Sequence, residues 1–87
     1  MKMFCICRST DIATGLRLSG IDTLLVSNNT TNEIKEIINE LYNDKSIGIL
    51  GITEDVYDDL KNDVEKLALK QDLPLVIKIP NTKRILR

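Results

Sequence analysis

The sequence predicts an α/β fold built on a four-stranded parallel sheet. Four short apolar runs with the character of strands alternate with three stretches of helical periodicity, which gives the order βαβαβαβ. The intervals between these runs are long enough for the crossovers that parallel strands need. Right-handed crossovers favour the strand order 2-1-3-4, with helices on both faces of the sheet. At 87 residues the chain forms a single α/β domain, because so short a chain supports only one core.

The predicted strands are aliphatic and end at polar turns or prolines. The third has isoleucine at alternate positions, interleaved with Gly48, Leu50 and Gly51, which suits a strand covered by helices on both faces. Pro74 and Pro80 flank the fourth strand, and proline at a strand's first position is tolerated at a sheet edge. The strands are predicted at residues 3–7, 23–26, 47–52 and 75–79.

The predicted helices carry start and stop signals. Thr30 and Glu33 form a capping box ahead of a helix whose apolar residues recur at helical spacing. Thr53 is predicted to cap the third helix, with acidic residues in its first turn, where negative charge is favoured. Gly15 lies inside the first helix at a cost of about 1 kcal/mol relative to alanine, so we expect a close helix–sheet contact there. The helices are predicted at residues 11–19, 30–42 and 53–70.

Composition argues against two classes of partner. Twelve basic and thirteen acidic residues leave a net charge of −1, so there is no overall field to attract nucleic acid or an anionic membrane. One Phe, two Tyr and no Trp provide few rings for stacking on bases. No segment approaches the ~18 apolar residues of a membrane span, and the first residues lead into a strand rather than a signal peptide. We therefore expect a cytoplasmic protein without a membrane span and without a nucleic-acid partner.

The predicted strand order places a crevice between the first and third strands, where a small-molecule site of this fold class would lie. Arg8 to Asp11 and Thr53 to Asp55 line it. Neither G-x-G-x-x-G nor G-x-x-x-x-G-K-[ST] occurs, and the absence of histidine excludes histidine acid–base catalysis. The winding is Rossmann-like and receiver-like, but the fifth strand and its lysine, which a phospho-receiver needs, are missing. We expect no catalytic residue, no cofactor and no metal.

Two alternatives place a functional site in this crevice: a Mg²⁺ site and a reactive cysteine. The residues of each also have an ordinary structural explanation. Four acidic side chains after the third strand have the chemistry of Mg²⁺ ligands, although acid in a first helical turn is ordinary dipole compensation. These are Glu54, Asp55, Asp58 and Asp59. Cys7, followed by Arg8-Ser9-Thr10, resembles the phosphocysteine loop of the small IIB components of sugar phosphotransferase systems. The alternative function is therefore a phosphocysteine carrier with Cys7 as nucleophile, against Cys7 as a buried packing residue.

Three segments together resemble a known family. They are Thr14-Gly15-Leu16-Arg17-Leu18-Ser19-Gly20, Ile49-Leu50-Gly51-Ile52-Thr53-Glu54 and Pro74-Leu75-Val76-Ile77-Lys78-Ile79-Pro80. In this order they are similar to the G-F-R-L-(small)-G segment, the strand ending I-T-E and the late strand ending I-P of the F subunit of the V-type and A-type ATPase (ATP synthase). Leu16 stands where that family usually has phenylalanine, and Arg8-Ser9 replaces a common glycine-aspartate.

The resemblance implies a central-stalk rotor subunit that is not itself catalytic. Such a subunit couples ATP hydrolysis or synthesis in the head to transport of hydrogen or sodium ions through the membrane ring. Its implied partners are the coiled-coil D subunit of the stalk and, in the assembled complex, the catalytic head and the membrane rotor ring. It would lie peripherally on the cytoplasmic side of the membrane. A degenerate receiver-like adaptor without a rotary partner is a third hypothesis.

Two surfaces are candidates for the partner interface. One is the loop end formed by Thr53, Glu54 and Asp55. The other is a basic tail that includes Lys83, Arg84 and Ile85, for which a frayed terminus is an equal alternative. The family continues past the I-P segment into a linker and a helix. Residues 81–87 are therefore expected to be a short C-terminal tail, truncated relative to the family if residue 87 is not the natural end.

Overall fold

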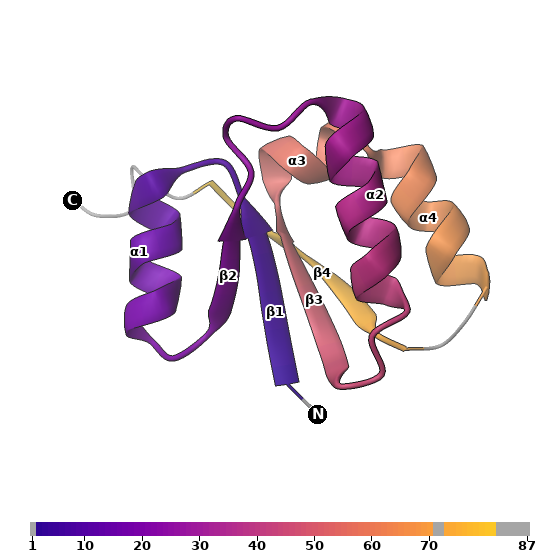
Figure 1. Ribbon diagram of the computed structural model, residues 1–87, viewed down its shortest axis with the longest axis horizontal. Helices are drawn as coiled ribbons and strands as arrows, with labels where there is room; N and C mark the ends of the chain where they lie inside the picture. Colours follow the sequence, from indigo (N-terminus) through magenta and orange to yellow (C-terminus); the bar gives the residue numbers. More distant parts are fainter. Residues whose placement is uncertain (1, 71–72, 82–87) are drawn as a thin grey trace.

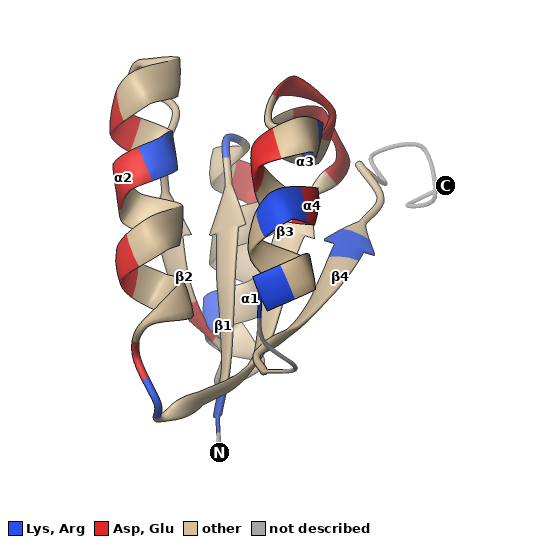
Figure 2. Ribbon diagram, turned by 90° about the vertical axis from the view of Figure 1, so that its right-hand side faces the viewer, with Lys and Arg blue, Asp and Glu red and all other residues tan. Residues whose placement is uncertain are grey.

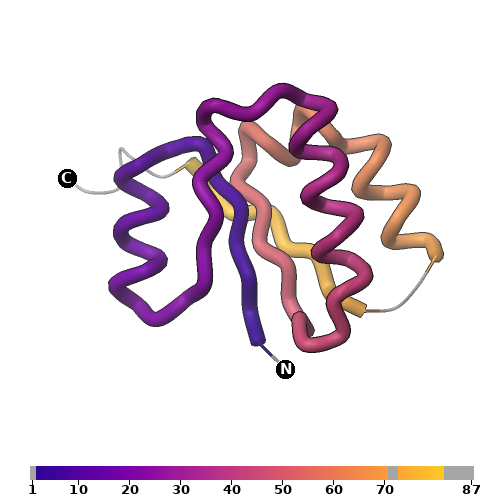
Figure 3. The backbone as a smooth tube through the Cα atoms, viewed as in Figure 1, coloured from indigo at the N-terminus to yellow at the C-terminus, as the bar shows by residue number. Residues whose placement is uncertain are grey.

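The computed structural model describes residues 2–70 and 73–81 and contains a four-stranded parallel sheet. The strand order is β2-β1-β3-β4, which confirms the predicted 2-1-3-4 topology (Figures 1 and 3). The strands are β1 (Lys2–Cys7), β2 (Asp22–Leu25), β3 (Ile47–Thr53) and β4 (Leu75–Ile79). The helices are α1 (Thr10–Leu18), α2 (Thr31–Tyr42), α3 (Glu54–Asp59) and α4 (Lys61–Lys70).

The helices are divided unequally between the two faces of the sheet. Figure 1 shows α1 alone on one side and α2, α3 and α4 on the other. Side chains of a strand alternate between faces, so Ile6, Leu50 and Val76 point towards the three-helix side. There they pack with buried residues of α2, α3 and α4 in one hydrophobic cluster. The main core therefore lies between the sheet and α2 to α4. The buried members of this cluster are Ile6, Val26, Ile34, Ile38, Tyr42, Leu50, Ile52, Val56, Leu60 and Val64.

The predicted capping box of α2 is confirmed, and α1 also begins at a side-chain cap. Ser9 caps α1, and its hydroxyl accepts a hydrogen bond from the Ile12 N–H at 3.3 Å. In the capping box of α2, Thr30 Oγ1 accepts from the Glu33 N–H at 3.2 Å, while Glu33 Oε1 accepts from the Thr30 N–H at 2.9 Å. This second bond holds the pKa of Glu33 below its ordinary value. Local sequence signals thus fix where both helices begin.

The third crossover differs from the prediction, because it contains two helices instead of one. The backbone leaves the helical conformation at Leu60, which has φ −120° and ψ 21°, and α4 starts at the next residue. Val56, Leu60 and Val64 are all buried but lie four residues apart. In one continuous helix this spacing would rotate the apolar stripe by about 40° at each step. The break at Leu60 lets all three side chains face the same core.

Two glycines of the first crossover have different roles from one another. Gly20 has φ +84°, a left-handed conformation that glycine adopts without strain, and it follows the end of α1 as predicted. Gly15 was expected at a close helix–sheet contact, and this expectation is wrong. A Cβ added to Gly15 would meet no atom within 4 Å. Packing does not explain that glycine.

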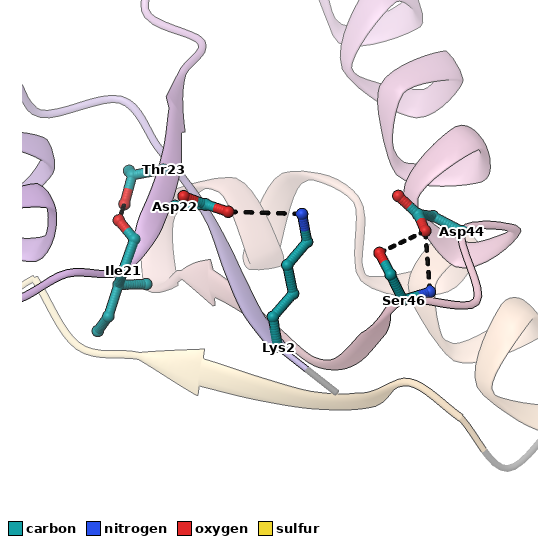
Figure 4. Close-up of polar contacts among 6 residues, drawn as sticks. All are labelled: Lys2, Ile21, Asp22, Thr23, Asp44 and Ser46. Atoms are coloured by element: carbon teal, nitrogen blue, oxygen red, sulfur yellow. Dashed lines mark hydrogen bonds and ion pairs between the residues drawn. The ribbon is translucent and has the colours of Figure 1, made fainter.

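Polar contacts hold the end of the sheet where the strands begin (Figure 4). Lys2 Nζ lies 3.5 Å from Asp22 Oδ2, which ties β1 to β2. In the turn before β3, Asp44 Oδ1 accepts from the Ser46 hydroxyl at 2.7 Å and from its N–H at 2.9 Å. The hydroxyl bond is the main reason why the pKa of Asp44 is lowered. The candidate functional site lies at the opposite end of the sheet, where the strands end.

Candidate functional site

At the carboxyl end of the sheet, where the crevice between β1 and β3 was predicted, the structure has an ion pair. Arg8 follows β1, and its Nη1 lies 2.7 Å from Asp59 Oδ2 at the end of α3. The two side chains are 31% and 51% exposed, so the pair lies at the protein surface. A guanidinium engaged in this way is less available for an anionic ligand. The arrangement connects the first βα turn to the third crossover.

The end of β3 is occupied by internal hydrogen bonds. Thr53 is fully buried, and its hydroxyl donates to Asp55 Oδ1 at 2.8 Å. The same carboxylate oxygen accepts from the Val56 N–H at 2.9 Å. Thr53 occupies the N-cap position as predicted, but its side chain makes no capping bond, because Asp55 receives the backbone N–H instead. These groups satisfy one another, which argues for a structural role.

A residue from the end of the chain completes this network. Asn81 Oδ1 accepts a hydrogen bond from the Asp55 N–H at 3.1 Å, which joins the segment after β4 to the first turn of α3. Sequence reasoning missed Asn81, since its partner lies 26 positions away and no local motif connects the two. The only hint in the sequence was that a polar residue, able to accept a hydrogen bond, directly follows Pro80.

Three of the four acidic residues considered for Mg²⁺ have separate partners in the structure. Asp55 is bonded to Thr53, Asp59 pairs with Arg8, and Asp58 Oδ1 lies 3.0 Å from Lys78 Nζ on β4. This last contact is the main cause of the raised pKa of Lys78. Within residues 2–70 and 73–81, no group of three or more His, Cys, Asp or Glu side chains is placed to hold a metal ion.

Both cysteines are buried and reduced. Cys5 and Cys7 are 0% exposed, and desolvation raises the pKa of each thiol. Cys7 Sγ donates to the Ser9 carbonyl at 3.5 Å. A phosphoryl acceptor needs an accessible thiolate. The structure therefore gives no support to the carrier alternative.

The predicted interface residues fall into two groups. Glu54 is exposed and Asp55 partly buried, whereas Thr53 is fully buried behind them. Lys83, Arg84 and Ile85 lie outside the residues that the structure describes. The structure thus leaves Glu54 and Asp55 as the accessible members of the first predicted surface.

An apolar surface on the other side of the sheet was not predicted. Ile49, Leu75 and Ile77 are 37%, 58% and 42% exposed, and we call them the uncovered strip. Ile49 pairs in register with Leu75, and Ile77 with Gly51 on β3, so the strip lies across two neighbouring strands. Residues 47–52 were predicted to be covered on both faces, and at Ile49 this is wrong. The alternation of apolar residues at 75, 77 and 79 indicated that one face of this strand is apolar. Such a pattern does not identify the element that covers that face.

The opposite face of β4 borders an open groove of about 340 Å³. Its lining comes from α4, β4 and the two tyrosines Tyr42 and Tyr57. Lys78 lies 5.3 Å from the centre of the Tyr57 ring, and its charge is paired with Asp58. The groove shares Leu75 with the uncovered strip but includes none of the residues predicted to line the crevice.

No helix in the described part of the chain is long and apolar enough to cross a membrane.

A search of curated proteins finds no match to this sequence. The family model of the ATP synthase (F/14-kDa) subunit, in contrast, matches residues 5–86, which include all four strands apart from the first residues of β1. The match agrees with the resemblance carried by the three sequence segments. The chain belongs to the ATP synthase F/14-kDa subunit family, and it is a subunit of a V/A-type ATPase.

Proposed function

We propose that this chain is the central-stalk rotor subunit of a V/A-type rotary ATPase and is not itself catalytic. In this role it binds the coiled-coil D subunit of the stalk and helps to couple ATP hydrolysis or synthesis in the head to ion transport through the membrane ring. It acts on the cytoplasmic side of the membrane, attached through the complex. Family membership is the observation that carries this proposal.

The arrangement of the crevice supports a mechanical role. The groups that line it bond to one another: Arg8 to Asp59, Thr53 to Asp55, and Asp55 to Asn81. These bonds connect the ends of β1, β3 and β4 across the sheet. A subunit that transmits torque benefits from such internal connections, because strain is passed on where packed elements cannot move independently.

Co-purification with the coiled-coil stalk partner tests the proposal. The full chain, expressed together with the coiled-coil subunit of the same ATPase, is expected to elute as a one-to-one complex. ATP hydrolysis by the isolated chain is expected to equal the buffer background. If the two proteins elute separately at micromolar concentration, the rotor assignment is wrong.

The carrier alternative has its own decisive measurement. A phosphocysteine carrier would acquire acid-labile phosphate from a phosphorylated donor and would lose it in Cys7→Ser. We expect no such labelling, since the Cys7 thiol is buried. Labelling that disappears in Cys7→Ser would replace the rotor assignment with the carrier.

A further inference from the structure

A second groove, of about 190 Å³, lies between α2 and α4. The two helices run side by side on the same face of the sheet (Figure 1). The lining of this groove shares no residue with the groove beside β4 or with the predicted crevice. We call it the basic groove, and its lining consists of Lys35, Ile38 and Asn39 from α2 and Asp63, Lys66, Leu67 and Lys70 from α4.

Helical spacing explains why these side chains meet. Residues three and four positions apart lie on the same side of a helix. The lining residues of α2 are at positions 35, 38 and 39, and those of α4 are at positions 63, 66, 67 and 70. Each helix therefore contributes one continuous stripe, and the two stripes border the same groove.

The basic groove has an excess of two positive charges, although the whole chain has a net charge of −1. One of its three lysines is paired, because Lys35 Nζ lies 3.5 Å from Asp63 Oδ2. Among the residues that the structure describes, neither Lys66 nor Lys70 has an ion-pair partner. Two ammonium groups thus border the groove without a counter-charge.

Helix electrostatics account for only one of these two lysines. Lys70 lies in the last turn of α4, where the helix dipole favours a positive charge. Lys66 lies one turn earlier, outside that favourable range, and like charges four positions apart repel each other. A bound anion would relieve this repulsion.

The most buried residues of the lining are apolar. Ile38 is 1% exposed and belongs to the main core, and Leu67 packs against that core. Lys66 and Lys70, in contrast, are exposed. This combination suits an anion with a short carbon skeleton, because the skeleton gains from contact with apolar surface while the charge stays near water.

The size of the basic groove limits its ligand. Water occupies about 30 Å³ per molecule, so the groove has room for roughly six waters. Sites for drug-sized ligands are larger and start at about 300 Å³. Among the described residues that line the groove, none is aromatic, so no ring is present on which a base could stack. A nucleotide is a poor fit, whereas a small phosphorylated molecule is a good one.

We propose that the basic groove binds a small phosphomonoester. Lys66 and Lys70 hold the phosphate, and the carbon skeleton lies against Leu67 and Ile38. A phosphomonoester carries a charge of about −1.5 to −2 at pH 7, which balances the excess positive charge of the groove. Lysine binds phosphate as a point charge without a fixed geometry, which suits an open groove. This inference goes beyond the rotor role and does not depend on it.

An extended polyanion is a poorer ligand for the same groove. Glu36 and Glu40 are exposed on α2, and Glu65 is exposed on α4. Figure 2 shows basic residues in blue on α4 and several acidic residues in red along α2. A nucleic acid or an acidic protein segment that extended beyond the groove across these helices would meet carboxylates of its own sign.

Titration of the full chain with propyl phosphate tests the proposal. In about 0.1 M salt, the backbone amide NMR signals of residues 66–70 are expected to shift until they saturate, with a dissociation constant of about 1 mM or lower. Propanol, which lacks the phosphate, is expected to leave the signals in place. Inorganic phosphate is expected to bind at least ~3-fold more weakly, because it gains nothing from the apolar residues.

Lysine substitutions on α4 include a matched control. Lys66→Gln and Lys70→Gln are each expected to weaken binding of propyl phosphate at least ~5-fold, since each removes a charge that holds the phosphate. Lys61→Gln removes the same charge from the same helix, but Lys61 does not line the groove, so binding is expected to stay within ~2-fold. All three lysines are exposed, so the variants are expected to fold, which circular dichroism verifies.

Three results would overturn the proposal. One is the absence of saturable shifts up to about 20 mM propyl phosphate. Another is equal weakening in all three lysine variants, which would show only an effect of net charge. The third is equal affinity for inorganic phosphate and propyl phosphate, which would remove the role of the apolar residues. None of these results affects co-purification with the stalk subunit, so the rotor assignment is tested separately.

Discussion

Asn81 accepts a hydrogen bond from the backbone of Asp55 at 3.1 Å and thereby links the end of the sheet's edge strand to the start of α3. Asn81→Ala should lower the free energy of unfolding by about 0.5–1.5 kcal/mol, the usual net value of one such bond. Asn81→Asp keeps an acceptor oxygen and should lose less. Urea unfolding of the three proteins provides the comparison, and equal midpoints for the wild type and Asn81→Ala would show that the bond contributes nothing.

Gly51 and Gly15 should respond oppositely to alanine. A Cβ on Gly51 would lie 2.7 Å from Ile79 Cδ1 and 2.8 Å from Cys5 Sγ, so these neighbours must move. Overpacking of this kind costs about 1–3 kcal/mol. Gly15→Ala meets open space inside a helix and should gain about 0.5–1 kcal/mol. Thermal unfolding of the two variants decides, and a stabilised Gly51→Ala would mean that the space beside β3 is larger than the structure shows.

The Arg8–Asp59 pair should contribute a small, salt-sensitive coupling. Both side chains are partly exposed, so solvent screens the attraction. A double-mutant cycle with Arg8→Met and Asp59→Asn is expected to give about 0.2–1 kcal/mol at low ionic strength. The value should fall in 1 M salt. Additive single effects at low salt would show that the two side chains do not interact.

The capping box of α2 should make stability depend on pH in the acid range. The Glu33 pKa is lowered on folding, mainly by the Thr30 N–H, so its ionised form is favoured in the folded state. Its stabilising effect is complete above the ordinary value of 4.5 and is lost as the pH falls through the folded pKa. Glu33→Gln keeps an acceptor but does not titrate there.

Unfolding of the wild type and Glu33→Gln should therefore be compared from pH 7 to pH 2.5. The stability difference between the two proteins is expected to be constant above pH 5 and to change below it. Parallel curves over the whole range would contradict a contribution from the Glu33 charge.

The topology could be predicted because each step depends on local pattern and chain direction. The capping box at Thr30, the alternation of isoleucine in residues 47–52 and the polar breaks between them identify the elements. Handedness of the crossovers then leaves few sheet orders. The division of the third crossover at Leu60 was missed, because apolar residues spaced by four also fit one continuous helix. Only the structure shows that the helix must break for these residues to face the same core.

The bonding at the carboxyl ends of β1 and β3, where the crevice was predicted, was not foreseen. The sequence singles out Arg8 and Thr53 by position, yet their partners are chosen by the fold. Asp59 reaches Arg8 only because α3 ends at that residue, and Asn81 reaches Asp55 only because β4 lies beside β3. Likewise, hydrophobic patterning predicts that Leu75 and Ile77 prefer burial but does not identify the element that covers them.

The uncovered strip gives the free chain an exposed apolar surface, and burial of such a surface in a complex would raise the chain's stability. Whatever binds only the folded chain raises its free energy of unfolding, by about 2.7 kcal/mol when the partner's concentration is 100 times the dissociation constant. The free chain would unfold more often than the assembled one, and its exposed aliphatic side chains would be the first surface available to chaperones and proteases. Excess copies made without a partner would therefore be removed, which would keep the amount of this protein matched to that of its complex.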